Sequence, residues 1–261
     1  MKKKLKIISV LIIAIILLLF ICDNRLKIVN YTLETDKISG EVKLAFVSDL
    51  HCCLYGEGQS ELISAIDTYE PDVVLLGGDI FDDDYVNNNS HIFIDDISKK
   101  YKTYYVSGNH EWWSGKMYGY FYYLTDIGVT VLRGESDCLD IGGNTVCISG
   151  VDDPDVDVYD DFDNTYIDEL EAVGNGIDSD YYNILLSHRP ENASLYFDYG
   201  FDLALAGHAH GGQGTIPFFL NGLFAPDQGF FPEYAGGIYD FDGQKMIVSR
   251  GLSKENTVLP R

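Results

Sequence analysis

Five short apolar runs in this chain each end abruptly at a string of polar residues. The runs cover residues 43–48, 72–76, 103–106, 183–187 and 202–206. The strings that complete or follow them read SDLH, GGDIFD, GNHE, SHRP and GHAH. Short aliphatic and β-branched runs followed by turn residues are typical of buried strands. The sequence therefore predicts five strands that each deliver polar side chains at the end where the strand stops.

Helical patterns separate these runs, at residues 60–69, 92–99, 116–125 and 166–172. Alternating strands and helices are typical of an α/β fold with a largely parallel sheet. Residues 129–150 and 236–249 read instead as antiparallel hairpins, so the fold needs a second or mixed sheet.

The polar strings are expected to meet at one edge of the sheet, because ligands of open α/β folds gather outside the carboxyl ends of the strands. The first candidate ligands after the five runs are Asp49, Asp79, Asn109, His188 and His208, each within three residues of the end of its run. Five loops should therefore line one rim.

Five of the six histidines lie inside these strings, at positions 51, 110, 188, 208 and 210. One such histidine alone would more often be an ordinary hydrogen-bonded residue, which is how we interpret His91. The joint pattern favours metal ligands. Asp82, which completes G-D-x-x-D, fits either a supporting acceptor or a solvated acidic loop with Asp83.

The amino terminus carries a membrane-directed segment. Four lysines within residues 1–6 precede an apolar run, residues 7–22, that only Ser9 interrupts. No small-x-small cleavage pattern follows the run, which favours an uncleaved transmembrane signal anchor over a cleaved signal peptide. The lysines predict a cytoplasmic flank at 1–6, a linker at 23–40 and an extracytoplasmic catalytic domain at 41–261, hence a single-pass protein of the cell membrane.

The net charge of −23 excludes nucleic acid as a partner, because an acidic surface repels a phosphate backbone. Cys138 and Cys147 flank a Gly142-Gly143 turn, and a cross-strand disulfide and two free thiols both remain open. The sequence leaves the oligomeric state undetermined.

A loop rich in large apolar residues follows the last string. It contains Phe218, Phe219, Leu223, Phe224, Phe230 and Phe231, punctuated by glycine and proline. Packing within the protein is the default interpretation. An apolar wall for a lipid tail, or a contact with the membrane, is the alternative.

The spacing within the strings suits metal binding. Asp49 and His51 alternate about Leu50, so both side chains leave one face of an extended strand end, and GHAH repeats this spacing. Asp79 follows two glycines, where the backbone can turn sharply, and Asn109 offers a neutral oxygen. Such mixed nitrogen and oxygen ligands suit Mn, Fe, Zn or Co, and two divalent cations can drive phosphate ester hydrolysis.

The series D-x-H, G-D-x-x-D, G-N-H-E, H and G-H-x-H resembles the calcineurin-like metallophosphoesterase family over residues 41–261. SHRP and GHAHGGQ, with the apolar amino-terminal segment, are more similar to its bacterial membrane-associated branch, which includes phosphodiesterases acting on lipid-linked UDP-sugars. The resemblance implies a four-layer αββα sandwich of two mixed β-sheets, preceded by one membrane helix.

The resemblance also implies roles for individual residues. One metal would be held by Asp49, His51, Asp79 and His210, and the other by Asp79, Asn109, His188 and His208. His110 would bind the phosphoryl group or protonate the leaving oxygen, with Glu111 orienting it. Arg189 could bind a phosphate oxygen or only cap its loop.

The predicted function is a membrane-anchored phosphoesterase with two metal ions and a metal-bridging hydroxide as nucleophile. A phosphodiesterase or pyrophosphate hydrolase on a lipid-linked or envelope substrate is favoured. The alternatives are a phosphomonoesterase or nucleotidase, and a surface protein that binds phosphorylated ligands through metal without turnover.

Overall fold

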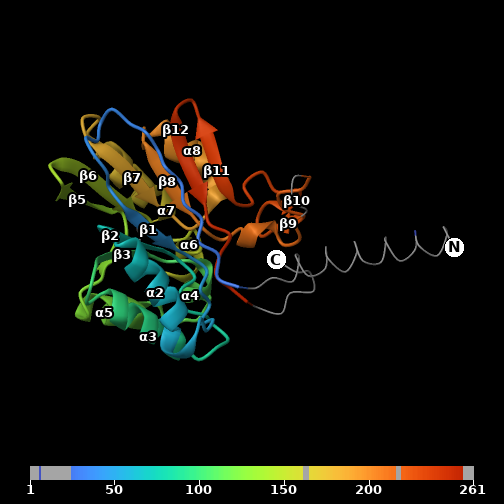
Figure 1. The fold of residues 1–261 in the computed structure, drawn as a ribbon. Coiled ribbons are helices and arrows are strands. Elements are labelled where there is room, and N and C mark those ends of the chain that lie inside the picture. Colours follow the sequence, from blue (N-terminus) through green and yellow to red (C-terminus); the bar gives the residue numbers. More distant parts are fainter. Residues whose placement is uncertain (1–5, 7–24, 161–164, 216–218, 255–261) are drawn as a thin grey trace.

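The computed structural model describes residues 6, 25–160, 165–215 and 219–254. Within these residues the strands form a four-stranded sheet, a six-stranded sheet and a two-stranded hairpin (Figure 1). Helices lie on the outer sides of the two larger sheets.

The four-stranded sheet has the order β1-β2-β3-β4, and all of its neighbouring strands run parallel. Its strands are β1 (Leu44–Val47), β2 (Val73–Gly77), β3 (Lys102–Val106) and β4 (Thr130–Val131). The expectation that both sheets would be mixed is wrong for this one. Both antiparallel hairpins join the other sheet instead.

The six-stranded sheet is mixed, with a parallel centre and an antiparallel hairpin at each edge. In spatial order its strands are β11 (Gly237–Phe241), β12 (Gln244–Val248), β8 (Leu203–Ala206), β7 (Tyr182–Leu186), β6 (Asn144–Gly150) and β5 (Glu135–Ile141). Cys138 and Cys147 face each other in the β5–β6 hairpin and form a disulfide. This answers the question that the sequence left open.

The helices follow the predicted alternation. They are α2 (Ser60–Tyr69), α3 (Asn88–Ile97), α4 (Asn109–Trp113), α5 (Met117–Asp126), α6 (Val156–Tyr159), α7 (Tyr166–Asn175) and α8 (Ala193–Asp198). Short 3-10 turns occur at η1 (Glu57–Gln59), η2 (Pro190–Asn192) and η3 (His210–Gly212). The five predicted strands and four predicted helices are all present, with ends that shift by a few residues.

Alternation along the central strands divides the core into two. Val73 and Leu75 of β2 belong to a cluster between the two sheets, together with residues of β7 and β8. Val74 and Leu76 point the other way and pack in the cluster that includes the helices. Both faces of each central strand are buried, which explains why these strands are apolar runs rather than alternating ones. The order of layers is helix, sheet, sheet, helix (Figure 1).

The predicted membrane segment, residues 7–22, lies outside the described residues. Among residues 6, 25–160, 165–215 and 219–254, no helix is long and apolar enough to cross a membrane.

Candidate metal centre

The loops after β1, β2, β3, β7 and β8 meet at one edge of the sandwich, as the sequence predicts. Backbone hydrogen bonds hold neighbouring loops together. The Asp49 N–H donates to the Gly78 carbonyl and the His51 N–H to the Asp79 carbonyl, both at 3.0 Å. The Gly207 N–H donates to the His188 carbonyl at 3.0 Å. The site is therefore built on a rigid backbone frame.

The backbone is strained at these loops. Asp49, His51, Asp79, His208 and His210 all have positive φ angles, between 44° and 62°. Residues other than glycine rarely adopt this left-handed conformation, and each such residue costs on the order of 1–3 kcal/mol. The rest of the fold holds these five residues in the orientation that brings their side chains together.

Two motif glycines make room for the carboxylates. A Cβ atom at Gly108 would collide with the carboxylate of Asp79, and one at Gly207 would approach the Asp49 carboxylate to 2.6 Å. The glycines of G-N-H-E and G-H-A-H are therefore required because a polar side chain of the site occupies the space beside them.

Among the described residues, acidic and histidine side chains form four groups that could hold a metal ion, and two of these groups share Asp79. Within each group the candidate ligand atoms lie within 4.8 Å of one another. The first group contains Asp49, His51, Asp79 and His210, and the second contains Asp79, His188 and His208. Asn109 is buried and lines the same cavity as Asp79 and His208. The structure thus brings the six nominated Asp and His residues into these two groups and places Asn109 at the same cavity.

The donor set fits divalent cations. His188 Nδ1 lies 2.7 Å from the Gly77 carbonyl, so this nitrogen donates and Nε2 remains for a ligand. That Nε2 lies 3.2 Å from Asp79 Oδ2, which His51 Nε2 approaches from another direction at 3.5 Å. A neutral imidazole nitrogen and a carboxylate oxygen would repel at this distance, and a cation between them would remove the repulsion.

Three other candidate ligand atoms also indicate a metal site. Asp49 Oδ2, Asn109 Oδ1 and His208 Nδ1 are buried and have no hydrogen-bond partner. A buried polar atom without a partner costs about 1–3 kcal/mol, so three such atoms at one place indicate a ligand that completes them. The side chains present can therefore hold a metal.

The contact between Asp79 and His188 favours positive charge at this place. Burial opposes charge on His188, but the carboxylate of Asp79 raises the pKa of His188 to about 10. The same contact, with His51 nearby, holds the pKa of Asp79 well below its usual range although burial opposes this. The Asp79 carboxylate thus attracts positive charge to the space between the two ligand groups.

His110 lies at the cavity beside the ligand groups. Its Nδ1 is 2.6 Å from Asp83 Oδ1 and 3.8 Å from Asp82 Oδ2, and its ring packs against that of Trp113 with centroids 4.8 Å apart. Asp82 itself is bound to His51, with Nδ1 at 2.8 Å from Oδ2, which settles Asp82 as a supporting acceptor. The sequence missed Asp83, whose only signal was its place in an acidic run.

Glu111 does not orient His110, contrary to the prediction. It is fully buried, and its two carboxylate oxygens accept the backbone N–H groups of Asp79, Ile80, Phe81 and Gly108 at 2.8–3.0 Å. Burial, followed by the neighbouring Asp79 charge, raises the pKa of Glu111 to about 7. Glu111 ties the loop after β2 to the start of α4, so it positions Asp79.

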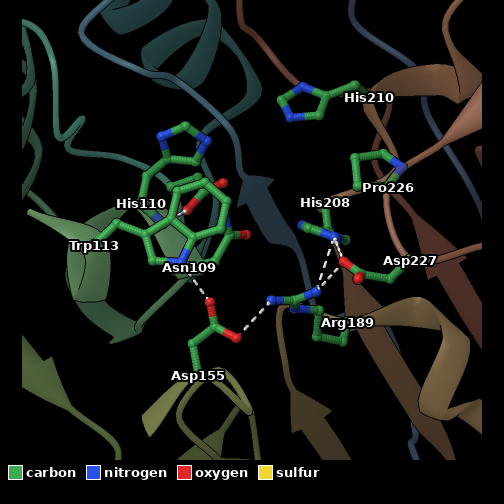
Figure 2. Close-up of a pocket in the computed structure, with 10 residues that line it drawn as sticks. Asn109, His110, Trp113, Asp155, Arg189, His208, His210, Pro226 and Asp227 are labelled. Carbon is green, nitrogen blue, oxygen red and sulfur yellow. Dashed lines mark hydrogen bonds and ion pairs between the residues drawn. The ribbon is translucent and has the colours of Figure 1, made fainter. Parts of the chain in front are cut away.

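Arg189 is held by carboxylates. Its Nε and Nη2 contact both oxygens of Asp153 at 2.5 and 2.9 Å, and its Nη1 contacts Asp227. The same Nη1 lies 3.1 Å from His208 Nε2, which is 2.8 Å from Asp227 Oδ2 (Figure 2). Asp153 and Asp227 were not singled out from the sequence, because neither lies in a strand-end motif.

A cavity of about 280 Å³ opens over these residues. Figure 2 shows Trp113 and His110 on one side of it and Pro226, Asp227 and His208 on the other. Trp113 Nε1 donates to Asp155 at 2.6 Å, which fixes the exposed indole at the rim. The metal-ligand groups thus open into a space that admits a small ligand.

Residues 42–212 match the family model described as calcineurin-like phosphoesterase. An uncharacterized metallophosphoesterase of Helicobacter pylori is 29% identical over 87% of this chain and 58% of its own length. One from Campylobacter jejuni is 27% identical over 93% of this chain and 63% of its own length. The chain therefore spans about three fifths of the length of these curated relatives.

Solved structures agree on the fold. The phosphopantetheinyl hydrolase of Mycobacterium tuberculosis superposes with a TM-score of 0.51 at 13% identity, over 82% of this chain and 92% of that one. The NAD nucleotidase of Haemophilus influenzae gives 0.51 at 16% identity, over 81% of this chain and 45% of that one. With the family match and the buried Asp and His groups, these findings show that the chain belongs to the calcineurin-like phosphoesterase family of metal-dependent hydrolases.

Proposed function

We propose that this protein is a phosphoesterase with two metal ions, anchored in the membrane, and that it cleaves phosphodiesters or pyrophosphates in preference to phosphomonoesters. The observation that carries the dinuclear site is the position of Asp79 Oδ2 between His51 Nε2, at 3.5 Å, and His188 Nε2, at 3.2 Å. One carboxylate that belongs to two ligand groups is what a pair of bridged cations requires.

Two bound divalent cations would supply positive charge for the phosphoryl oxygens and activate a water molecule for attack. The first would be held by Asp49, His51, Asp79 and His210, and the second by Asp79, Asn109, His188 and His208. The chain's own residues do the remaining work. Asp82 and the Gly77 carbonyl hold the rings of His51 and His188 in orientation.

His110 is placed to serve the leaving group. With its Nδ1–H donated to Asp83, its second ring nitrogen is available to the cavity, where it can bind a phosphoryl oxygen or give a proton to the departing oxygen. A protein that only bound phosphorylated ligands would have no use for such an acid. The Asp83–His110 pair therefore supports turnover over binding alone.

The charge of the cavity supports a diester. Asp155 and Asp227 stand on its wall beyond the ligand groups, and Arg189 is already paired with Asp153 and Asp227. A phosphomonoester dianion would meet more repulsion there than a diester or pyrophosphate substrate with less charge on the reacting phosphoryl group. The lipid-linked or envelope substrate is our proposal from the predicted anchor at residues 7–22.

Two observations support a membrane protein with its domain outside the cytoplasm. Disulfides persist mainly in oxidising compartments, and Cys138 is bonded to Cys147. A relative from Bos taurus, 28% identical over 70% of this chain, carries the name transmembrane protein with metallophosphoesterase domain.

The test is hydrolysis of a bis-aryl phosphate and an aryl monophosphate by the full chain in detergent, with Mn added and then chelated. We expect metal-dependent turnover of both, with the higher kcat/KM on the diester. The His188→Gln variant should lose activity on both substrates. A higher kcat/KM on the monoester would favour the nucleotidase alternative, and no turnover with metal bound would favour the binding protein.

A further inference from the structure

Residues 219–231 form an ordered loop that we call the aromatic hairpin. Its strands β9 (Phe224–Ala225) and β10 (Gly229–Phe230) pair antiparallel, and the rings of Phe224 and Phe230 pack with centroids 5.5 Å apart. The Phe231 N–H donates to the Leu223 carbonyl at 2.8 Å. The hairpin therefore presents its side chains in a defined arrangement.

One side of the hairpin belongs to the metal centre. Pro226 and Asp227 at its turn line the cavity, and Asp227 Oδ2 lies 2.8 Å from His208 Nε2 (Figure 2). At its base, the Leu223 N–H donates to the Gly212 carbonyl at 2.6 Å, just beyond the GHAH string.

The hairpin also carries three large apolar side chains that are open to solvent. Phe219 is 89% exposed, Phe230 73% and Phe231 69%. Full burial of one such side chain is worth about 1.5–3 kcal/mol, so three together on one small loop indicate an apolar partner. These rings are uncharged, whereas the chain as a whole is acidic, with a net charge of −23.

The chain leaves little room between this domain and a membrane. The apolar run ends at Cys22, and Leu26 already packs against the core. Four residues span at most roughly 14 Å when fully extended. In Figure 1 the blue segment at the start of the domain lies on the same side of the domain as β9 and β10.

We propose that the aromatic hairpin docks on the bilayer, with Phe219, Phe230 and Phe231 in the interfacial region of the lipid. This inference rests on the membrane anchor of the proposed function. An acidic protein with neutral aromatic contacts should bind zwitterionic lipid without needing anionic headgroups. Because Pro226 and Asp227 of the same hairpin line the cavity, docking would bring the opening of the metal centre close to the headgroups.

The experiment measures depth by fluorescence quenching. The full chain is reconstituted into phosphatidylcholine vesicles with and without brominated acyl chains, as the parent protein and as the variants Phe230→Trp and Tyr122→Trp. Tyr122 on α5 is 77% exposed and is the matched control on another face. We expect brominated lipid to quench most of the fluorescence that Phe230→Trp adds and little of what Tyr122→Trp adds.

Three results would overturn the proposal. Equal quenching of the two variants in vesicle-bound protein would refute the docking and leave the anchor standing. Protein that does not bind the vesicles would refute both the docking and the membrane anchor. A Phe230→Ser/Phe231→Ser variant that turns a dimeric parent into a monomer, without a difference in quenching, would assign this face to a second copy. Metal-dependent hydrolysis of the bis-aryl phosphate, measured on the same samples, reports the phosphoesterase separately.

Discussion

Asp83 Oδ1 lies 2.6 Å from His110 Nδ1, and this contact joins an acidic loop after β2 to a histidine in the first turn of α4. It fixes the ring of the one motif histidine whose proposed role is not metal binding. Asp83 is a positioning residue, because it acts on the substrate through His110.

Asp83→Asn should lower kcat roughly tenfold with metal content unchanged, because the amide can no longer accept as a carboxylate does and the imidazole loses its orientation. The measurements are steady-state hydrolysis of the bis-aryl phosphate and metal analysis of the purified protein. Asp84→Asn, at the exposed neighbouring position, is the matched control and should match the parent. Equal rates for all three proteins would exclude this role for Asp83.

His110→Gln and His188→Gln should separate catalysis from metal binding. His110→Gln removes the leaving-group donor and should cut kcat roughly a hundredfold to ten-thousandfold while metal content is spared. His188→Gln removes a ring that faces Asp79 Oδ2 at 3.2 Å and should lose metal together with activity. If His110→Gln also lost metal, His110 would be a ligand, in line with its proximity to His51 and Asp82.

The ligands could be predicted from the sequence because the fold delivers them locally. Asp49, Asp79, Asn109, His188 and His208 each follow the strand that positions them, so the apolar runs and their ends were enough. The same is true of α2, whose predicted and observed bounds coincide at Ser60–Tyr69.

The supporting contacts could not be predicted, because they join residues far apart in the chain. Asp227 reaches His208 across 19 residues, and Arg189 reaches Asp153 across 36. Glu111 was assigned to its neighbour His110, yet its carboxylate turns back to backbone donors 30 to 32 residues earlier. Glu111 was expected to contact His110 because the two are neighbours in sequence, but at the start of α4 its carboxylate is directed to the backbone of the loop after β2.

Metal binding should release protons. The metal-free protein holds His188 protonated at neutral pH, since Asp79 raises the pKa of His188 to about 10, and a cation can bind only the neutral ring. The pair stabilises the metal-free fold fully below the ordinary histidine pKa, and this contribution is lost as pH rises toward 10. The Kd for Mn should therefore fall about tenfold per pH unit between about pH 7 and 9, if one proton is displaced.

Calorimetry in two buffers of different ionisation enthalpy checks this. The apparent binding enthalpies then differ by the number of protons released multiplied by the difference between the two ionisation enthalpies. Activity should also fall on acidification through about pH 6, because an imidazole must be neutral to bind a metal ion. A Kd independent of pH from 7 to 9 would show that the imidazole is already neutral before metal binds.

Glu111→Gln should destabilise the fold more than it alters chemistry. An amide offers one acceptor oxygen and an NH₂ group that would face the N–H donors, so up to two of four backbone hydrogen bonds are lost. The expected loss is about 3 kcal/mol, or roughly 6–12 °C in Tm by thermal unfolding. Glu171→Gln, at an exposed position of α7, is the control and should leave Tm unchanged.

The Cys138–Cys147 disulfide should stabilise the edge of the six-stranded sheet and leave the metal centre alone, because no residue of the centre lies on β5 or β6. Thiol titration of the unfolded, unreduced chain should find three free thiols among its five cysteines. Cys138→Ser/Cys147→Ser should lower stability by about 2 kcal/mol, or roughly 4–8 °C in Tm, with kcat on the bis-aryl phosphate unchanged. Reductant should lower the parent's Tm by the same amount and leave the variant's unaffected. Five free thiols in protein taken from the cell envelope would instead place this domain in a reducing compartment and reverse the proposed membrane orientation.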